Sequence, residues 1–359
     1  MAGNSESAVR DVPTSVVDEA ELQRKVDLAI NAAGQRPMLE RPLQSLAVFH
    51  WGLMPFLCMA IFFLLCSIPP LWLIVVPYVI WILFVDDAYI VGKRRKEWLR
   101  RSPVFRYLRE YFPIELVRTA ELKPDRPYLF AYHPHGIIGF GAVTSFGSEA
   151  CGFSAKYPGI TPHVLTLESN FQMPLYREYL ISLGFGAVSR KACEAMLRKG
   201  PGNAIVIVVG GAQESLNARP GELDLTLKRR KGFVRVAMRT GADLVPVLGF
   251  GENDIYVQAD NHNGSWLYWL QQKVKRTLGF TVPIIIGRGL SHRAFGWMPY
   301  QRPIHVVAGA PIRVPHTETP TSEELDEAHG RYVAALAQLY EDHKDLYAPH
   351  RIRDLRFVE

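Results

Sequence analysis

The distribution of apolar and polar residues divides the chain into three parts. Residues 1–44 are mainly polar, and residues 17–33 have the pattern of a short amphipathic helix. Residues 46–85 contain no charged side chain and are interrupted near the middle by Ser67-Ile68-Pro69-Pro70. From about Arg100, apolar runs of strand length alternate with helical patterns. We therefore expect a polar N-terminal extension at 1–44, a membrane hairpin at 45–91 and a cytosol-facing domain at 92–359.

The uncharged segment has the length of two membrane passages. One helical crossing needs about 20 apolar residues, so a stretch twice as long with a proline break predicts two passes or a re-entrant hairpin. Arg36 and Arg41 precede the segment, and six cations follow it, namely Lys93, Arg94, Arg95, Lys96, Arg100 and Arg101. By the positive-inside rule, both ends face the cytosol. The alternative, a buried helix pair, is disfavoured because such long uncharged runs are rare in soluble folds.

The alternation beyond Arg100 predicts an α/β domain with a mostly parallel sheet flanked by helices. Apolar strands are expected at 128–132, 204–209, 244–250 and 304–308, and a helix is expected at 231–239. Thr321 and Glu324 have the spacing of a capping box, which begins a second helix. Its apolar stripe consists of Leu325, Ala328, Tyr332, Leu336, Leu339 and Leu346.

Two histidines stand at the end of the first strand, in the sequence His133-Pro134-His135-Gly136. Pro134 restricts the backbone, and Gly136 permits a sharp turn. Ligands of open α/β sheets bind where strands end, and imidazole is suited to proton abstraction near neutral pH. We therefore expect one of the pair, His135 in preference, to act as a general base. The alternative is a histidine that only satisfies a backbone group.

Glu214 is the expected partner of the histidines. It follows the strand at 204–209 and the pair Gly210-Gly211, which would bring it to the same sheet edge. There its carboxylate could orient an imidazole, or it could be a solvated turn residue. The two glycines could offer N–H donors to a ligand or could only form a tight turn.

Metal, nucleotide-hydrolysing and serine-nucleophile sites are not indicated. The four cysteines, Cys58, Cys66, Cys151 and Cys193, have no paired spacing, so neither a disulfide framework nor a metal site is predicted. The spacing of a phosphate-binding loop is absent, and Val143-Thr144-Ser145-Phe146-Gly147 lacks the first glycine of a nucleophile elbow. Nucleic-acid binding is disfavoured by the apolar hairpin, although the net charge is +6.

Six sequence blocks occur in the order of a known family. They are Tyr111-Phe112-Pro113, His133-Pro134-His135-Gly136, Asn170-Phe171-Gln172-Met173-Pro174, Val209-Gly210-Gly211-Ala212-Gln213-Glu214-Ser215, Arg230-Lys231-Gly232-Phe233, and Val245-Pro246 with Phe250-Gly251-Glu252-Asn253. From about Leu46 to Glu359 the chain resembles the type-2 diacylglycerol acyltransferases. Glu214-Ser215-Leu216-Asn217-Ala218-Arg219-Pro220-Gly221 and Phe357-Val358-Glu359 are most similar to the fungal members.

The resemblance implies an endoplasmic-reticulum membrane enzyme, with possible presence on lipid droplets, that transfers a fatty acyl group from acyl-CoA to diacylglycerol. Acyl-CoA is then a co-substrate, no cofactor is expected, and a homo-oligomer is possible. Monoacylglycerol or a long-chain alcohol remains an alternative acceptor, and a non-catalytic lipid-binding protein remains an alternative function. The layout also resembles glycerolipid acyltransferases in which four residues separate the catalytic histidine from an aspartate. Here Ile138 and Phe140 occupy those positions, so a local carboxylate is missing.

The basic residues near the predicted site suit the phosphates of CoA, or alternatively a membrane surface. The cations considered are Arg190, Lys228, Arg229, Arg230 and Lys231. With the family blocks, the expected substrate-binding residues are Tyr111, Phe112, Pro113, Pro134, Gly136, Asn170, Arg190, Gly210, Gly211, Arg230, Lys231, Gly232 and Phe233. The aromatic pair Tyr111-Phe112 could equally give structural support at the membrane interface.

Overall fold

The computed structural model describes residues 40–258, 269, 271, 273, 284–289 and 295–358. The helix predicted at 17–33, and the N-terminal extension up to residue 39, lie outside the described residues.

A mostly parallel sheet of seven strands forms the centre of the described part. Its order is β1 (Ile114–Arg118), β11 (Ile304–Ala308), β7 (Asp243–Phe250), β2 (Tyr128–His133), β5 (Asn203–Val208), β3 (Thr161–Thr166) and β4 (Gly186–Ala187). Neighbouring strands are parallel except β11 and β7, which run antiparallel. The predicted α/β class is confirmed, and all four predicted strands are present within one residue of their expected bounds.

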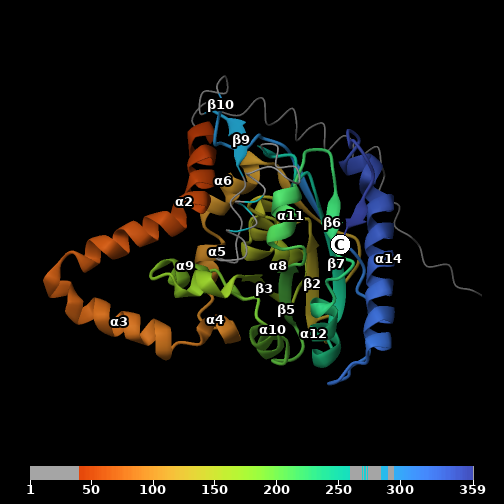
Figure 1. Cartoon of the computed structure of the whole chain (residues 1–359), viewed down its shortest axis with the longest axis horizontal. Helices are drawn as coiled ribbons and strands as arrows, with labels where there is room; N and C mark the ends of the chain where they lie inside the picture. Colours follow the sequence, from red (N-terminus) through yellow and green to blue (C-terminus); the bar gives the residue numbers. More distant parts are fainter. Residues whose placement is uncertain are drawn as a thin grey trace, which may run out of the picture. The chain divides into compact units, whose positions relative to one another are not determined.

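Three helices lie on one face of the sheet, and each contacts a central strand. They are α10 (Arg190–Leu197) against β5, α12 (Gly232–Thr240) against β2, and α14 (Ser322–Tyr347) against β7, and α12 contacts both of the others. Figure 1 shows the three helices from left to right in the order α10, α12 and α14. The opposite face contacts α7 (Phe140–Ala142) and the π-helical segment Val143–Gly147.

The predicted capping box begins α14. The Glu324 N–H donates to the Thr321 hydroxyl at 3.2 Å, and the Thr321 N–H donates to the Glu324 carboxylate at 2.8 Å. Of the predicted stripe, Leu325, Ala328, Tyr332, Leu336 and Leu339 are buried, and Leu346 is half-buried. The stripe therefore faces the sheet and fixes the side of α14 that meets it.

Short elements complete the domain. Three helices lead from the hairpin to β1, namely α4 (Ala88–Val91), α5 (Glu97–Arg100) and α6 (Pro103–Tyr111). The helices between later strands include α8 (Phe153–Lys156), η3 (Glu168–Gln172), α9 (Tyr176–Ser182) and α11 (Ala212–Asn217). Two smaller sheets join β10 (Phe295–Gly296), β9 (Ile285–Arg288) and β8 (Val257–Gln258), and β12 (Arg356–Val358) with β6 (Asp224–Thr226).

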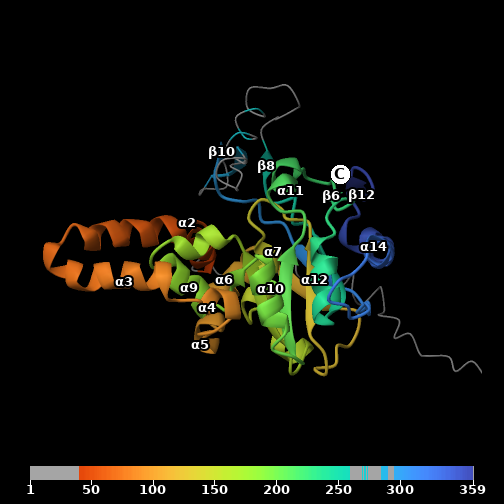
Figure 2. The same cartoon turned by 60° about the horizontal axis from the view of Figure 1, so that its bottom comes forward.

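The apolar segment forms a helical hairpin that extends away from the sheet (Figures 1 and 2). It consists of α2 (Glu40–Cys66), the short turn η1 (Pro69–Leu71) and α3 (Trp72–Phe84), so the predicted interruption is confirmed. Large apolar side chains such as Phe56, Leu73 and Phe84 are exposed on it. Among the described helices, α2 alone is long and apolar enough to cross a membrane; the second arm, Pro69–Phe84, is shorter. This indicates association with a membrane.

The hairpin is anchored to the domain at both ends. Near the first end, the Trp51 ring lies 5.9 Å from that of Phe185 and 6.3 Å from that of Phe105. Near the second, the fully buried Arg177 forms an ion pair with Asp86 at 2.5 Å. These contacts fix the hairpin relative to the helices that follow it.

Candidate active site

Strand β2 carries the histidine pair to the carboxyl edge of the sheet. It lies between β5 and β7, and all six of its residues are buried. The turn that follows requires glycine at position 136, where φ is +57° and a Cβ atom would lie 2.6 Å from Cγ of Glu252. The residues Pro134, His135 and Gly136 are thus held by a rigid central strand at the edge where ligands of such sheets bind.

The two histidines have different environments. The ring of His133 is fully buried, and its Nε2 lies 3.0 Å from the hydroxyl of Tyr332 on α14. That hydroxyl donates its proton to the carbonyl of Ala131 at 3.1 Å, so its oxygen accepts the Nε2–H of His133. The ring of His133 is therefore a fixed part of the interior.

His135 is only partly buried, and a hydrogen bond of its ring indicates which nitrogen carries the proton. Nδ1 lies 3.1 Å from the carbonyl oxygen of Gly136, which can only accept, so Nδ1 carries the proton. In the neutral ring, Nε2 then keeps the lone pair. Of the two histidines, His135 is the one that can present a basic nitrogen to an incoming hydroxyl group.

Glu214 reaches the same edge, where its hydrogen bonds go to backbone N–H groups. Its two carboxylate oxygens accept the N–H of His135 and the N–H of Thr226, each at 2.8 Å. Its Oε1 also lies 4.0 Å from Nδ1 of the His133 ring. The side chain is 2% exposed, which does not fit the alternative of a solvated turn residue. The buried carboxylate therefore fixes the backbone that carries His135.

The two glycines after β5 make room for this carboxylate. At Gly210 a Cβ atom would lie 1.7 Å from Cδ of Glu214, so any side chain there would displace the carboxylate. Gly211 has φ +60° and begins α11, which carries Glu214. Both glycines follow β5, the strand next to β2.

Glu252 is a second buried carboxyl group at this edge, to which the sequence analysis assigned no role. It follows β7, is fully buried, and accepts the hydroxyl of Tyr132 at 2.8 Å and the N–H of Gly141 at 2.9 Å. Burial raises the pKa of the Glu252 carboxyl to about 7. Because Tyr132 precedes the histidine turn and Gly141 follows it, Glu252 joins the two sides of the turn. The only sequence signal was its place in the block Phe250-Gly251-Glu252-Asn253.

The raised pKa of Glu252 predicts a pH-dependent stability. The folded protein binds this proton more tightly than the unfolded chain, whose carboxyl has a pKa near 4.5. The stabilising contribution is therefore complete below pH 4.5 and is lost as the pH rises to about 7, at a cost on the order of 3 kcal/mol. Glu252→Gln should remove this pH-dependent component. The melting temperature of the variant minus that of the unsubstituted protein should therefore be larger at pH 8 than at pH 5. Equal differences at both pH values in thermal melts would contradict this.

Tyr111 and Phe112 lie in the core. They are 1% and 0% exposed, and the Tyr111 hydroxyl donates to the carbonyl of Pro299 at 2.6 Å and receives Arg288 at 2.7 Å. The Phe112 ring packs 4.6 Å from that of Phe140, which follows the histidine turn. Pro113 ends this segment before β1. The position supports packing beneath the turn rather than direct contact with a substrate.

Asn170 and Arg190 lie near β3 and β4, which are separated from β2 by β5. The Asn170 amide donates to the Thr166 hydroxyl at 2.8 Å. The Arg190 side chain is 71% exposed, with Nε 3.9 Å from Glu194. Among the described residues, neither contacts the histidine turn.

The block Arg230-Lys231-Gly232-Phe233 begins α12 and is divided between surface and core. Arg230 and Gly232 are exposed, and Lys231 pairs with Asp326 of α14. Phe233 is buried, and its ring lies 4.8 Å from that of Tyr332, the residue that holds His133. The block thus connects a basic surface to the rings behind the histidines.

Known proteins match this chain over most of its length. A family model described as diacylglycerol acyltransferase matches residues 62–357. Diacylglycerol O-acyltransferase 2A of Umbelopsis ramanniana is 45% identical over 348 residues, which cover 94% of this chain and 98% of that protein. Human diacylglycerol O-acyltransferase 2 is 46% identical over 316 residues, covering 86% of this chain and 81% of the relative.

Among solved structures, the 1-acyl-sn-glycerophosphate acyltransferase PlsC from Thermotoga maritima is similar with a TM-score of 0.36 and 11% identity, and the match covers 77% of this chain and 97% of that one. The expected resemblance is confirmed by the family model and by the two relatives. This chain belongs to the diacylglycerol acyltransferase family.

Proposed function

We propose that this protein is an acyl-CoA:diacylglycerol O-acyltransferase, which transfers a fatty acyl group to the free hydroxyl of 1,2-diacylglycerol and makes triacylglycerol. The observation that carries the mechanism is His135, a partly exposed imidazole at the sheet edge whose Nδ1 is bonded to a carbonyl, leaving Nε2 as the base. The curated relatives named above supply the acceptor class.

The reaction proceeds by direct transfer within a ternary complex. Nε2 of His135 takes the hydroxyl proton as the hydroxyl oxygen attacks the thioester carbonyl carbon, and a C–O bond forms. The tetrahedral intermediate then collapses, the C–S bond breaks, and the CoA thiolate receives the proton from the imidazolium. The backbone N–H groups at Gly210 and Gly211 are candidates to hold the negative charge on the carbonyl oxygen. Glu214 acts through the backbone of His135, as a positioning residue.

The function is tested by acyl transfer from labelled oleoyl-CoA in membranes of cells that lack triacylglycerol synthesis. Diacylglycerol, monoacylglycerol and hexadecanol are offered in parallel, with His135→Ala as the control. Triacylglycerol formed only by the unsubstituted protein is the expected result. Wax ester or diacylglycerol as the main product would keep the mechanism and change the acceptor, and no product with any acceptor would favour the lipid-binding alternative.

The hairpin supports a re-entrant attachment to the endoplasmic-reticulum membrane or to a lipid droplet, with both ends and the catalytic domain facing the cytosol. The second arm, Pro69–Phe84, has 16 residues and spans about 24 Å as a helix, less than the roughly 30 Å of a bilayer's hydrocarbon core. The first arm packs against the domain at Trp51, and Cys58 further along it is buried, so its free part is no longer than the second arm. We also propose that the protein can form a homo-oligomer.

A re-entrant hairpin predicts that its tip is protected from both sides of the membrane. Cys66 ends α2 directly before the tip, whereas Cys151 and Cys193 are buried in the domain. In sealed vesicles, a membrane-impermeant maleimide should leave Cys66 unmodified from either side, and detergent should expose it. Cys66→Ser serves as the control that assigns the label. Labelling from the lumenal side alone would instead indicate two complete passes.

A further inference from the structure

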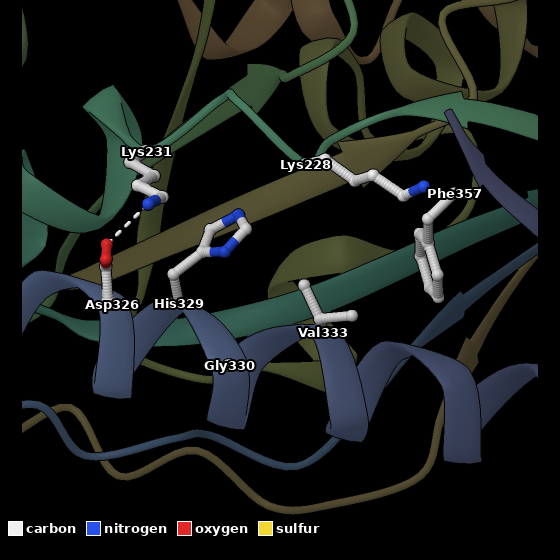
Figure 3. A pocket seen from close by; sticks show the side chains of 7 residues that line it. All are labelled: Lys228, Lys231, Asp326, His329, Gly330, Val333 and Phe357. Atoms are coloured by element: carbon white, nitrogen blue, oxygen red, sulfur yellow. Dashed lines mark hydrogen bonds and ion pairs between the residues drawn. The ribbon is translucent and has the colours of Figure 1, made fainter. Parts of the chain in front are cut away.

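A pocket on the helix-covered side of the domain contains neither histidine of the turn. It has a volume of about 380 Å³ and lies between α14, the segment that joins β6 to α12, and strand β12 (Figure 3). Its walls include Lys228, Lys231, Asp326, His329, Val333 and Phe357. This volume is within the range of small-molecule sites, roughly 300–1,000 Å³.

The two lysines of the pocket differ in their pairing. Lys231 forms an ion pair with Asp326 at 2.5 Å, so its charge is balanced. Lys228 is exposed and has no acceptor among the residues that the structure describes. Figure 3 shows its side chain extending toward the ring of Phe357, on the opposite side of the pocket from the Lys231–Asp326 pair. The pocket thus combines an available cation with an aromatic ring, which suits a phosphate next to a flat base.

His329 gives this pocket a neutral polar group. The residue is 7% exposed, and its Nε2 lies 3.1 Å from the carbonyl of Leu227, so Nε2–H donates. Burial lowers the pKa of His329, which keeps the ring neutral and leaves Nδ1 as an acceptor. An exocyclic amino group is the kind of donor that such a nitrogen accepts.

We propose that this pocket binds the nucleotide end of the acyl-CoA donor, with the adenine against Phe357 and a phosphate on Lys228. The proposal rests on the function proposed above. CoA carries an adenine and several phosphates. The adenine ring corresponds to the ring of Phe357, its exocyclic amino group to the acceptor nitrogen of His329, and a phosphate to the cation of Lys228.

Packed rings connect the pocket to the histidine turn. His329 and Tyr332 are three residues apart on α14, and the Phe233 ring lies 6.3 Å from the first and 4.8 Å from the second. The Tyr332 hydroxyl then reaches Nε2 of His133 at 3.0 Å. Because these rings are buried, the pantetheine arm of CoA would run around them, and not through them, to bring the thioester to His135. Changes in the pocket should therefore weaken donor binding without removing the group that takes the proton.

Gly330 offers a way to fill the pocket. It lines the pocket on the exposed side of α14, and a Cβ atom there would have no neighbour within 4 Å. Gly330→Leu therefore places a side chain into the cavity without a clash. Gln338→Leu is the matched control, since it adds an exposed leucine to the same helix about 12 Å further along its axis. Lys228→Gln removes the available charge at an exposed position.

The test compares oleoyl-CoA with oleoyl-pantetheine, which has the same thioester and lacks the nucleotide. For the unsubstituted protein, kcat/KM should be higher with oleoyl-CoA. Gly330→Leu and Lys228→Gln should each reduce this preference about tenfold or more, through a higher KM for oleoyl-CoA. Their kcat/KM with oleoyl-pantetheine should be unchanged, which also shows that they are folded, and Gln338→Leu should retain the original preference.

An unchanged preference in Lys228→Gln together with an unchanged or equally reduced activity of Gly330→Leu on both donors would overturn the pocket assignment. Lower binding of Lys228→Gln to phosphatidylserine vesicles, with the donor preference retained, would assign the cation to a lipid headgroup and also overturn it. Absence of acyl transfer by the unsubstituted protein with both donors would instead refute the proposed function. The two failures are thus distinguishable.

Discussion

Replacing His135 by alanine is expected to lower kcat by roughly 10²–10⁴-fold, the usual contribution of a positioned general base. The ring is partly exposed, and its described hydrogen bond joins Nδ1 to the carbonyl of the next residue. Its removal should therefore leave the fold intact, with a melting temperature close to that of the unsubstituted protein. Acyl transfer from oleoyl-CoA and a thermal melt of the same preparation check both parts of this expectation.

His133→Ala should behave differently, because this ring is part of the interior. It is fully buried, and it forms a hydrogen bond from β2 to Tyr332 on α14. Its loss therefore leaves a cavity and a hydroxyl oxygen without its donor. Activity and melting temperature should then fall together. The exposed His350 gives the matched control, and His350→Ala should change neither. If His135→Ala kept its kcat while a folded His133 variant lost it, the assignment of the base would be reversed.

The core of the fold was predictable because its signals are local. The strands next to the site are continuous apolar runs, as expected for strands buried on both faces, and Asn203–Val208 and Tyr128–His133 are within one residue of their predicted bounds. The capping box of α14 is likewise defined by residues three apart. The convergence of Glu214 and His135 also followed from local order, since both follow strands that pair in parallel.

The details of the site depend on contacts between residues that are far apart in the sequence. Tyr332 was predicted only as part of an apolar stripe, and its hydroxyl group reaches His133 across 199 positions of sequence. Glu252 reaches Tyr132 across 120 positions. No periodicity indicates which polar atom on a buried face will meet which strand end. The carboxylate of Glu214 was expected at an imidazole, and it lies 4.0 Å from Nδ1 of His133; its two hydrogen bonds to backbone N–H groups were not predictable for the same reason.

The support of the turn by Glu214 gives the second large effect, which is tested at Gly210. A Cβ atom at this position would lie 1.7 Å from Cδ of Glu214 and 2.1 Å from both carboxylate oxygens, so Gly210→Ala must displace the carboxylate. The backbone N–H groups of His135 and Thr226 then lose their acceptor. Each unpaired buried donor costs about 1–3 kcal/mol, which is enough to loosen the turn that carries the base.

Gly210→Ala is therefore expected to lower kcat by about 100-fold or more and the melting temperature by roughly 4 °C or more. The matched control is Gly52→Ala in α2, where a Cβ atom would have no neighbour within 4 Å. Since alanine favours helix over glycine, this variant should keep full activity and stability. Kinetics and thermal melts of both variants decide the point. If Gly210→Ala matched Gly52→Ala in both measurements, the buried carboxylate of Glu214 would not be needed to hold His135, and the proposed positioning role would be wrong.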